Sequence, residues 1–133
     1  MDDLFNLKVL IIDDSFVNRQ LMKTILDDHF EQVIEAGDGL EALEILESGI
    51  VPDLVILDLM MPVMDGVETL RRMRELGYVF PVIIITADIE DINHNKCLEI
   101  GISGFINKPI HGYQVIRIIR EVLQNSKSNS SLK

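Results

Sequence analysis

The sequence contains no tryptophan, a single cysteine and no long hydrophobic run, and these absences narrow its possible functions. With Cys97 alone among 133 residues, no disulfide can form within the chain, as is typical of proteins from reducing compartments. No apolar stretch approaches the roughly 20 residues that a helix needs to cross a bilayer. The acidic amino terminus also lacks the layout of a secretory signal. We therefore predict a cytoplasmic protein without membrane insertion.

Positive charge is also scarce in this sequence. Lys and Arg together number 12 against 22 Asp and Glu, which gives a formal net charge of −10. A domain this acidic repels a nucleic-acid backbone, and its cations form no basic stripe. We therefore expect no direct nucleic-acid binding.

Five short apolar segments alternate with five segments of helical character. The predicted strands cover residues 8–12, 32–36, 54–59, 82–86 and 104–108. The predicted helices cover residues 16–29, 40–48, 67–76, 88–100 and 111–124. This alternation predicts a parallel sheet with helices on both faces. We expect an α/β fold of the flavodoxin-like, doubly wound kind, with five strands in the order 2-1-3-4-5.

The same pattern sets the expected limits of the domain. Residues 8–124 form one domain, preceded by a short lead at 1–7 and followed by a Ser- and Asn-rich segment at 125–133, which we predict to be a disordered tail. In the first helix, Ser15 can cap the amino terminus. The spacing of Val17, Leu21 and Ile25 predicts its buried stripe.

Polar side chains follow four of the five predicted strands. Asp13 and Asp14 come directly after the first strand, Asp58 follows the apolar core of the third, Thr86 ends the fourth and Lys108 ends the fifth. The carboxyl ends of parallel strands meet at one edge of a sheet, where open α/β folds build their sites. The sequence therefore predicts that these residues share one site.

The three carboxylates in this set favour a cation. In the order 2-1-3-4-5 the first and third strands are neighbours, so Asp58 would face Asp13 and Asp14. Clustered carboxylates repel one another and oppose folding unless a cation offsets them. Mg²⁺ prefers carboxylate and phosphate oxygens, and an Asp carboxylate can attack phosphorus to form an aspartyl phosphate. Taken singly, an Asp near a helix start or a Lys at a strand end has a simpler explanation as a dipole partner or a solvated charge.

Together these residues resemble the response-regulator receiver domain, the phosphoacceptor module of two-component signalling. The similarity extends from residue 8 to about residue 124. It rests on the Asp13-Asp14 pair, the stretch DLMMPVMDG that begins at Asp58, Thr86-Ala87, Lys108-Pro109 and the turn pattern Gly39-x-Glu41-Ala42-Leu43. These motifs occur in order and at suitable spacing, which makes the resemblance more specific than any one of them.

The resemblance implies a role for each acidic residue. Asp58 would accept a phosphoryl group from a phosphohistidine on a histidine kinase or phosphotransfer protein. Asp14 and Asp58 would bind Mg²⁺ directly, Asp13 mainly through water, and Met60 through its backbone carbonyl. The Met60 side chain is apolar and would shield the acyl phosphate from hydrolytic water.

The resemblance also implies a switch and two docking surfaces. Lys108 and Thr86 would hold the phosphoryl oxygens, and Phe105 would be the switch aromatic that responds when Thr86 moves. A downstream protein would bind the face made by the fourth helix, fifth strand and last helix. The kinase would dock on the first helix near Phe16 and Asn18, and the regulator would act as a monomer or a phosphorylation-dependent dimer.

Three other functions fit parts of the pattern. A haloacid-dehalogenase-type phosphatase needs an acidic residue where this chain has Met60, which cannot transfer protons. We therefore expect catalysis only of the chain's own phosphorylation and dephosphorylation. A flavodoxin-like cofactor carrier needs a phosphate-binding loop where Asp13 and Asp14 stand. An unphosphorylated interaction module, or a receiver excised from a hybrid kinase or larger regulator, remains an alternative to a stand-alone regulator.

Overall fold

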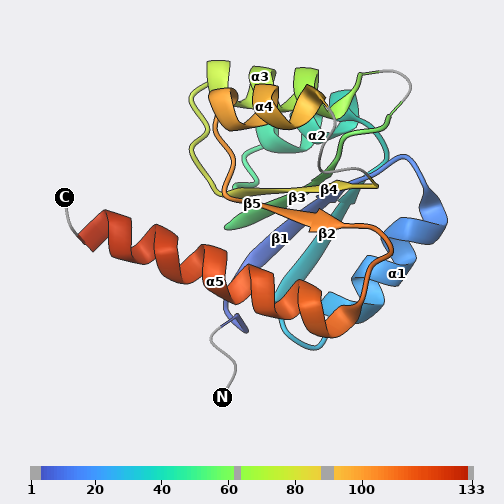
Figure 1. Cartoon of the computed structure of the whole chain (residues 1–133), viewed down its shortest axis with the longest axis vertical. Coiled ribbons are helices and arrows are strands. Elements are labelled where there is room, and N and C mark those ends of the chain that lie inside the picture. Colours follow the sequence, from blue (N-terminus) through green and yellow to red (C-terminus); the bar gives the residue numbers. More distant parts are fainter. Residues whose placement is uncertain (1–3, 62–63, 88–91, 132–133) are drawn as a thin grey trace.

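A parallel five-stranded sheet forms the centre of the molecule (Figure 1). The computed structural model describes residues 4–61, 64–87 and 92–131. The strands are β1 (Lys8–Ile12), β2 (Gln32–Ala36), β3 (Leu54–Asp58), β4 (Val82–Thr86) and β5 (Gly104–Asn107). Their spatial order is β2-β1-β3-β4-β5, and every pairing is parallel. The predicted fold class and strand order are confirmed, although β3 and β5 each end one residue earlier than predicted.

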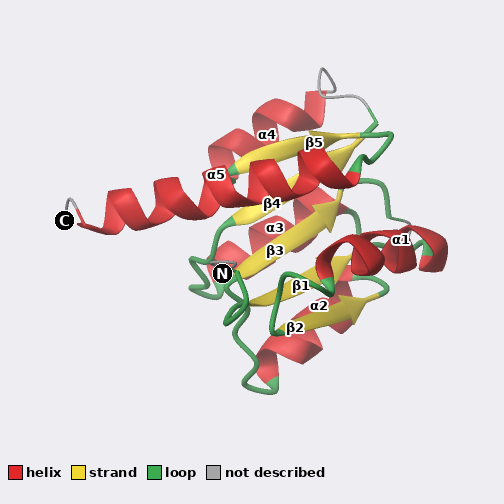
Figure 2. Cartoon of the chain, turned by 90° about the horizontal axis from the view of Figure 1, so that it is seen from below, coloured by secondary structure: helices red, strands yellow, loops and turns green. Residues whose placement is uncertain are grey.

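Helices cover both faces of this sheet. They are α1 (Phe16–Leu26), α2 (Gly39–Glu47), α3 (Gly66–Glu75), α4 (Ile92–Ile100) and α5 (Gly112–Ser131). Figures 1 and 2 show α1 and α5 on one face and α2, α3 and α4 on the other. The predicted start of the fourth helix, 88–91, lies outside the described residues. Among the described helices, none has the length and apolar character that a bilayer span requires.

The core consists of two layers separated by the sheet. Alternate strand residues point to opposite faces, so Leu10 and Leu57 pack with α2 and α3, whereas Ile11 and Ile56 pack with α1 and α5. All residues of β3 and β4 are buried. Because both faces are covered, these strands have unbroken apolar sequences rather than alternating ones. The two central strands thus give the site at their carboxyl ends a rigid base.

The inward face of α1 differs from the predicted one. Met22 and Leu26 are buried, whereas Val17 and Leu21 are 73% and 47% exposed. The helix contains two adjacent rows of apolar residues spaced by four, and spacing alone does not show which row meets the sheet. The predicted cap is confirmed, since the Ser15 hydroxyl accepts a hydrogen bond from the Asn18 N–H at 3.2 Å. The helix ends at residue 26 instead of 29.

The last helix is longer than predicted. The backbone of α5 continues to Ser131, beyond the end predicted at residue 124, and projects past the sheet (Figure 1). No Gly or Pro occurs from residue 113 to 131, and an existing helix gains one hydrogen bond for each residue that it adds. The segment predicted as a disordered tail, 125–133, therefore overlaps the end of this helix, and its last two residues lie outside the described part of the chain.

The amino-terminal lead contributes to the core. Leu4 is 2% exposed and belongs to the apolar cluster beneath α1 and α5. Its carbonyl accepts a hydrogen bond from the Leu7 N–H at 2.9 Å. The packed domain therefore includes part of the segment that the sequence analysis placed outside it.

Candidate functional site

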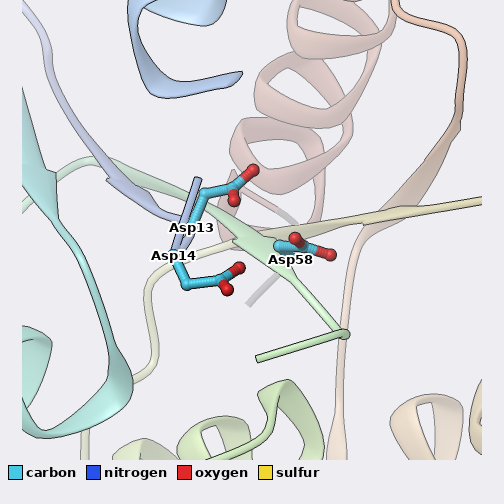
Figure 3. A group of neighbouring side chains, drawn as sticks. All are labelled: Asp13, Asp14 and Asp58. Atoms are coloured by element: carbon cyan, nitrogen blue, oxygen red, sulfur yellow. The ribbon is translucent and has the colours of Figure 1, made fainter. Parts of the chain in front are cut away.

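Three carboxylates meet at the carboxyl edge of the sheet. Asp13 and Asp14 follow β1 directly, and Asp58 is the last residue of the neighbouring β3. One carboxylate oxygen from each lies within 4.8 Å of one from each of the other two. Figure 3 shows Asp13 and Asp14 side by side, with their carboxylates on the side where Asp58 lies. The structure thus brings together the acidic residues that the sequence placed at this edge.

Burial makes this acidic cluster costly. Asp13 and Asp58 are each 3% exposed, whereas Asp14 is exposed. Burial raises the pKa of Asp13 from its ordinary 3.8 to about 6, and the negative charge of Asp58 adds to this rise. The Ser15 N–H, which donates to the Asp13 carboxylate at 2.9 Å, and the Lys108 ammonium act in the opposite direction. At neutral pH a cation at this position would relieve the repulsion.

Lys108 approaches the cluster from the far side of β4. Its Nζ lies 3.6 Å from Oδ2 of Asp58, and its side chain is 28% exposed. The Lys108 N–H donates to the carbonyl of Thr86 at 2.8 Å, which extends the β4–β5 ladder by one residue. The following peptide bond, to Pro109, is cis. The ammonium is close enough to interact with Asp58 and is also accessible to solvent.

Asp58 is held in place by the loop that follows it. Its Oδ1 accepts a hydrogen bond from the Met60 N–H at 3.1 Å, and the Met60 side chain is 66% exposed. The Gly66 N–H donates to the carbonyl of Leu59 at 3.1 Å, which closes the loop. A Cβ at Gly66 would lie 2.5 Å from the Asp58 carbonyl oxygen. The amino terminus of α3 therefore rests directly on the backbone of Asp58, and only glycine fits there.

The two expected switch residues lie on one face of neighbouring strands. Thr86 ends β4 and is 4% exposed. Phe105 on β5 pairs with Ile84, two residues before Thr86, and is half-buried against the cluster beneath α2, α3 and α4. Because side chains two apart on a strand point the same way, Thr86 and Phe105 both face the α3–α4 side of the sheet.

One charged group beside the acidic pair was missed in the sequence analysis. Arg19 of α1 donates a hydrogen bond from Nη1 to the backbone carbonyl of Asp13 at 2.7 Å. Its Nε donates to Glu35 of β2 at 3.2 Å. The available signal was an Arg one turn after the Ser15 cap, but exposed helix positions carry Arg so often that the residue type alone has little meaning.

Comparisons with known proteins identify the family. The family described as the response regulator receiver domain matches residues 9–120. The chain is 37% identical over 124 residues to the transcriptional regulatory protein CpxR homolog of Haemophilus influenzae, covering 93% of this chain and 53% of that protein. It is 34% identical over 116 residues to the chemotaxis protein CheY of Halobacterium salinarum, covering 87% of this chain and 96% of that protein. The chain therefore belongs to the receiver domain family of two-component signalling.

The similarity in fold extends to solved structures. The receiver domain of a sensor histidine kinase from Pseudomonas aeruginosa, described with a magnesium ion coordinated in its active-site cleft, has a TM-score of 0.79. That domain is 24% identical, and the match covers 90% of this chain and 98% of that one. The chain spans about half the length of the CpxR homolog and nearly all of the Halobacterium salinarum CheY.

Proposed function

We propose that this protein is a phosphoacceptor response regulator in which Asp58 receives a phosphoryl group from a phosphohistidine donor. The observation that carries this proposal is the position of Asp58. It is buried at a strand end, with two carboxylates within 4.8 Å and the Lys108 ammonium at 3.6 Å. A purely structural carboxylate would gain nothing from two like-charged neighbours, whereas a phosphoryl acceptor needs a cation there.

The chemistry of the site's donors fits Mg²⁺. Asp13, Asp14 and Asp58 offer hard oxygen ligands from two adjacent strands, and the Met60 carbonyl would add a fourth. Mg²⁺ is commonly bound by one or two carboxylates together with waters and a phosphate oxygen. When bound, it would neutralise charge on the phosphoryl oxygens. The magnesium described for the Pseudomonas receiver domain supports this choice of metal.

The residues of the chain would then act at stated atoms. A carboxylate oxygen of Asp58 attacks phosphorus, a new O–P bond forms, and the P–N bond of the phosphohistidine breaks with its electron pair returning to the imidazole nitrogen. The Lys108 ammonium leaves its partner Asp58 and pairs with a phosphoryl oxygen. The Thr86 hydroxyl donates to another phosphoryl oxygen. The donor is left with an unphosphorylated histidine, and we propose that the chain catalyses only its own phosphorylation and dephosphorylation.

Phosphorylation would be communicated through Thr86 and Phe105. Both face the α3–α4 side of the sheet, so movement of Thr86 toward the acceptor opens space near Phe105. The surface formed by α4, β5 and α5 would then bind a downstream protein, and the kinase would dock near Phe16 on α1, which is 65% exposed. We propose a cytoplasmic protein acting through protein partners rather than nucleic acid, as a monomer or a phosphorylation-dependent dimer. It would act alone or as part of a hybrid kinase or larger regulator.

Intact mass spectrometry tests the proposal directly. The protein is incubated with a small acyl-phosphate donor, with Mg²⁺ or with EDTA, beside Asp58→Asn and the control Asp53→Asn at the opposite end of β3. We expect one phosphoryl increment on the native protein and on the control. The increment should be missing from Asp58→Asn and from the EDTA sample. An increment that persists in Asp58→Asn would refute the assignment of the acceptor.

A further inference from the structure

The Asp13–Asp14 segment is fixed by a group outside the receiver motifs. Arg19 lies on the first turns of α1, and only 16% of its side chain is exposed. Its guanidinium makes two hydrogen bonds in different directions, one from Nη1 to the Asp13 carbonyl at 2.7 Å and one from Nε to Glu35 at 3.2 Å. The side chain therefore links the end of β1 to the end of β2.

Glu35 orients this arginine. Its Oε1 accepts from Arg19 and also from the amide nitrogen of Gln20 at 3.0 Å, while the Lys23 ammonium is farther away at 3.9 Å. On the other side, the Phe16 ring lies 5.7 Å from the Arg19 guanidinium carbon. The guanidinium is thus confined between a carboxylate, an aromatic ring and the backbone that it binds.

The bonded carbonyl has a special place in the site. It belongs to the peptide that joins Asp13 to Asp14, so its orientation sets the directions of both side chains. The Asp13 N–H donates to the carbonyl of Ala36 at 3.1 Å, and the Asp13 carboxylate accepts from Ser15. With the Arg19 contact, the N–H, the carbonyl and the side chain of Asp13 are each hydrogen-bonded.

We propose that Arg19, oriented by Glu35, is a positioning residue that holds the Asp13–Asp14 peptide in the geometry needed to bind Mg²⁺. This inference rests on the proposed metal and acceptor roles and adds a residue pair to them. The planar guanidinium of arginine can donate to Glu35 and to the Asp13 carbonyl at once, whereas the ammonium of lysine is a single point charge at the end of a flexible side chain. The role is therefore geometric, and lysine should not replace arginine here.

Isothermal titration calorimetry of the full chain with Mg²⁺ measures the effect without any phosphoryl donor. Substituting residues that orient metal ligands typically lowers metal affinity about 10- to 100-fold. We expect Arg19→Gln and Arg19→Lys each to raise the Mg²⁺ dissociation constant about 10-fold. Glu35→Gln, which keeps an acceptor for Arg19, should have a smaller effect. Phosphorylation at saturating Mg²⁺ should still reach completion in all three variants.

A matched pair elsewhere in the fold provides the control. Arg72 of α3 donates from Nε to Glu68 at 3.1 Å, nearly the same bond as that between Arg19 and Glu35, but it is 51% exposed. Arg72→Gln should leave the Mg²⁺ dissociation constant unchanged. Circular dichroism in EDTA establishes that each variant is folded, and Glu35→Ala, which removes the acceptor of Arg19 altogether, replaces any Arg19 variant that is not.

Two results would overturn the inference. Wild-type affinity in Arg19→Lys would mean that the positive charge matters and the fork geometry does not. Wild-type affinity in Arg19→Gln, or in Glu35→Ala where it stands in, would mean that the contact does not position the metal ligands. Either result leaves the proposed function intact if Asp58 is still phosphorylated. Failure of the native protein to become phosphorylated, with Mg²⁺ still bound, would refute the proposed function alone.

Discussion

Replacing Asp13 by asparagine should make the metal-free protein more stable. The substitution removes one negative charge from a cluster in which three carboxylates lie within 4.8 Å. It keeps an oxygen that can accept the Ser15 N–H, now bonded to the Asp13 carboxylate at 2.9 Å. Asparagine also has nearly the volume of aspartate, so the packing around this 3% exposed side chain should be preserved.

The magnitude follows from the pKa of Asp13. Its value is about 6 in the folded protein against 3.8 ordinarily, mainly because of burial. The folded state therefore binds the Asp13 proton more tightly than the unfolded state does. The stability that Asp13 contributes in this way is fully present below about pH 4 and is lost as the pH rises through about 6. A tenfold change in proton affinity corresponds to about 1.4 kcal/mol, so the loss above pH 6 amounts to at most about 3 kcal/mol. Asparagine carries no charge and avoids this loss.

Urea unfolding in EDTA at pH 7.5 and pH 4 measures the effect. At pH 7.5 we expect Asp13→Asn to be more stable than the native protein by about 1–3 kcal/mol. The difference should nearly vanish at pH 4, where the native Asp13 is protonated in the folded state. Saturating Mg²⁺ at pH 7.5 should also reduce the difference in stability. Mg²⁺ should bind the native protein more tightly than Asp13→Asn, and tighter binding to the folded state stabilises it more.

A capping aspartate serves as the matched control. Asp65 is the N-cap of α3, where its carboxylate accepts the Glu68 N–H at 2.8 Å, and it is not part of the three-carboxylate cluster. Asn and Asp are similar as helix caps, so Asp65→Asn should change stability by less than about 0.5 kcal/mol. The reasoning fails if Asp13→Asn is no more stable than the native protein at pH 7.5. It also fails if the gain is as large at pH 4, since the effect would then not arise from ionisation.

Three further predictions concern the surroundings of Asp58. Gly66→Ala should lower stability by about 1–3 kcal/mol in urea unfolding, because its Cβ would lie 2.5 Å from the Asp58 carbonyl oxygen; Gly37→Ala, whose Cβ meets nothing closer than 3.4 Å, is the control. Met60→Asn should speed loss of the phosphoryl group measured by intact mass, and equal or slower decay would defeat the idea that the exposed Met60 side chain shields it. Thr86→Ala should still be phosphorylated but should lose the phosphorylation-dependent NMR shift of the Phe105 ring; a full shift would contradict the proposed coupling.

Much of the site could be predicted because it depends on topology. Once β1 and β3 are recognised as neighbouring parallel strands, Asp13 and Asp58 must emerge at the same edge of the sheet. The unbroken apolar sequences of β3 and β4 likewise indicate interior strands of the sheet, because strands covered on both faces need no polar side. Strand-end residues are thus placed by backbone geometry, with little dependence on how the side chains pack.

Features that depend on side-chain packing were predicted poorly. In α1, two apolar rows spaced by four lie next to each other, and contact with the sheet selected Met22 and Leu26 over Val17 and Leu21. The end of α5 was misplaced because Ser and Asn weaken a helix without stopping it. Arg19 was missed because its role depends on a three-dimensional contact with the carbonyl of Asp13, which no sequence spacing encodes.

The acidic cluster and its arginine should affect stability and metal affinity in different ways. The repulsion that destabilises the metal-free fold is also what a cation relieves, so a substitution that removes this repulsion should raise stability and weaken Mg²⁺ binding together. Asp13→Asn is such a substitution. Arg19 stabilises a backbone carbonyl at 2.7 Å and carries no negative charge, so Arg19→Gln should weaken Mg²⁺ binding without raising stability. Plotting the two quantities for both variants therefore separates residues that attract the metal by charge from a residue that positions its ligands.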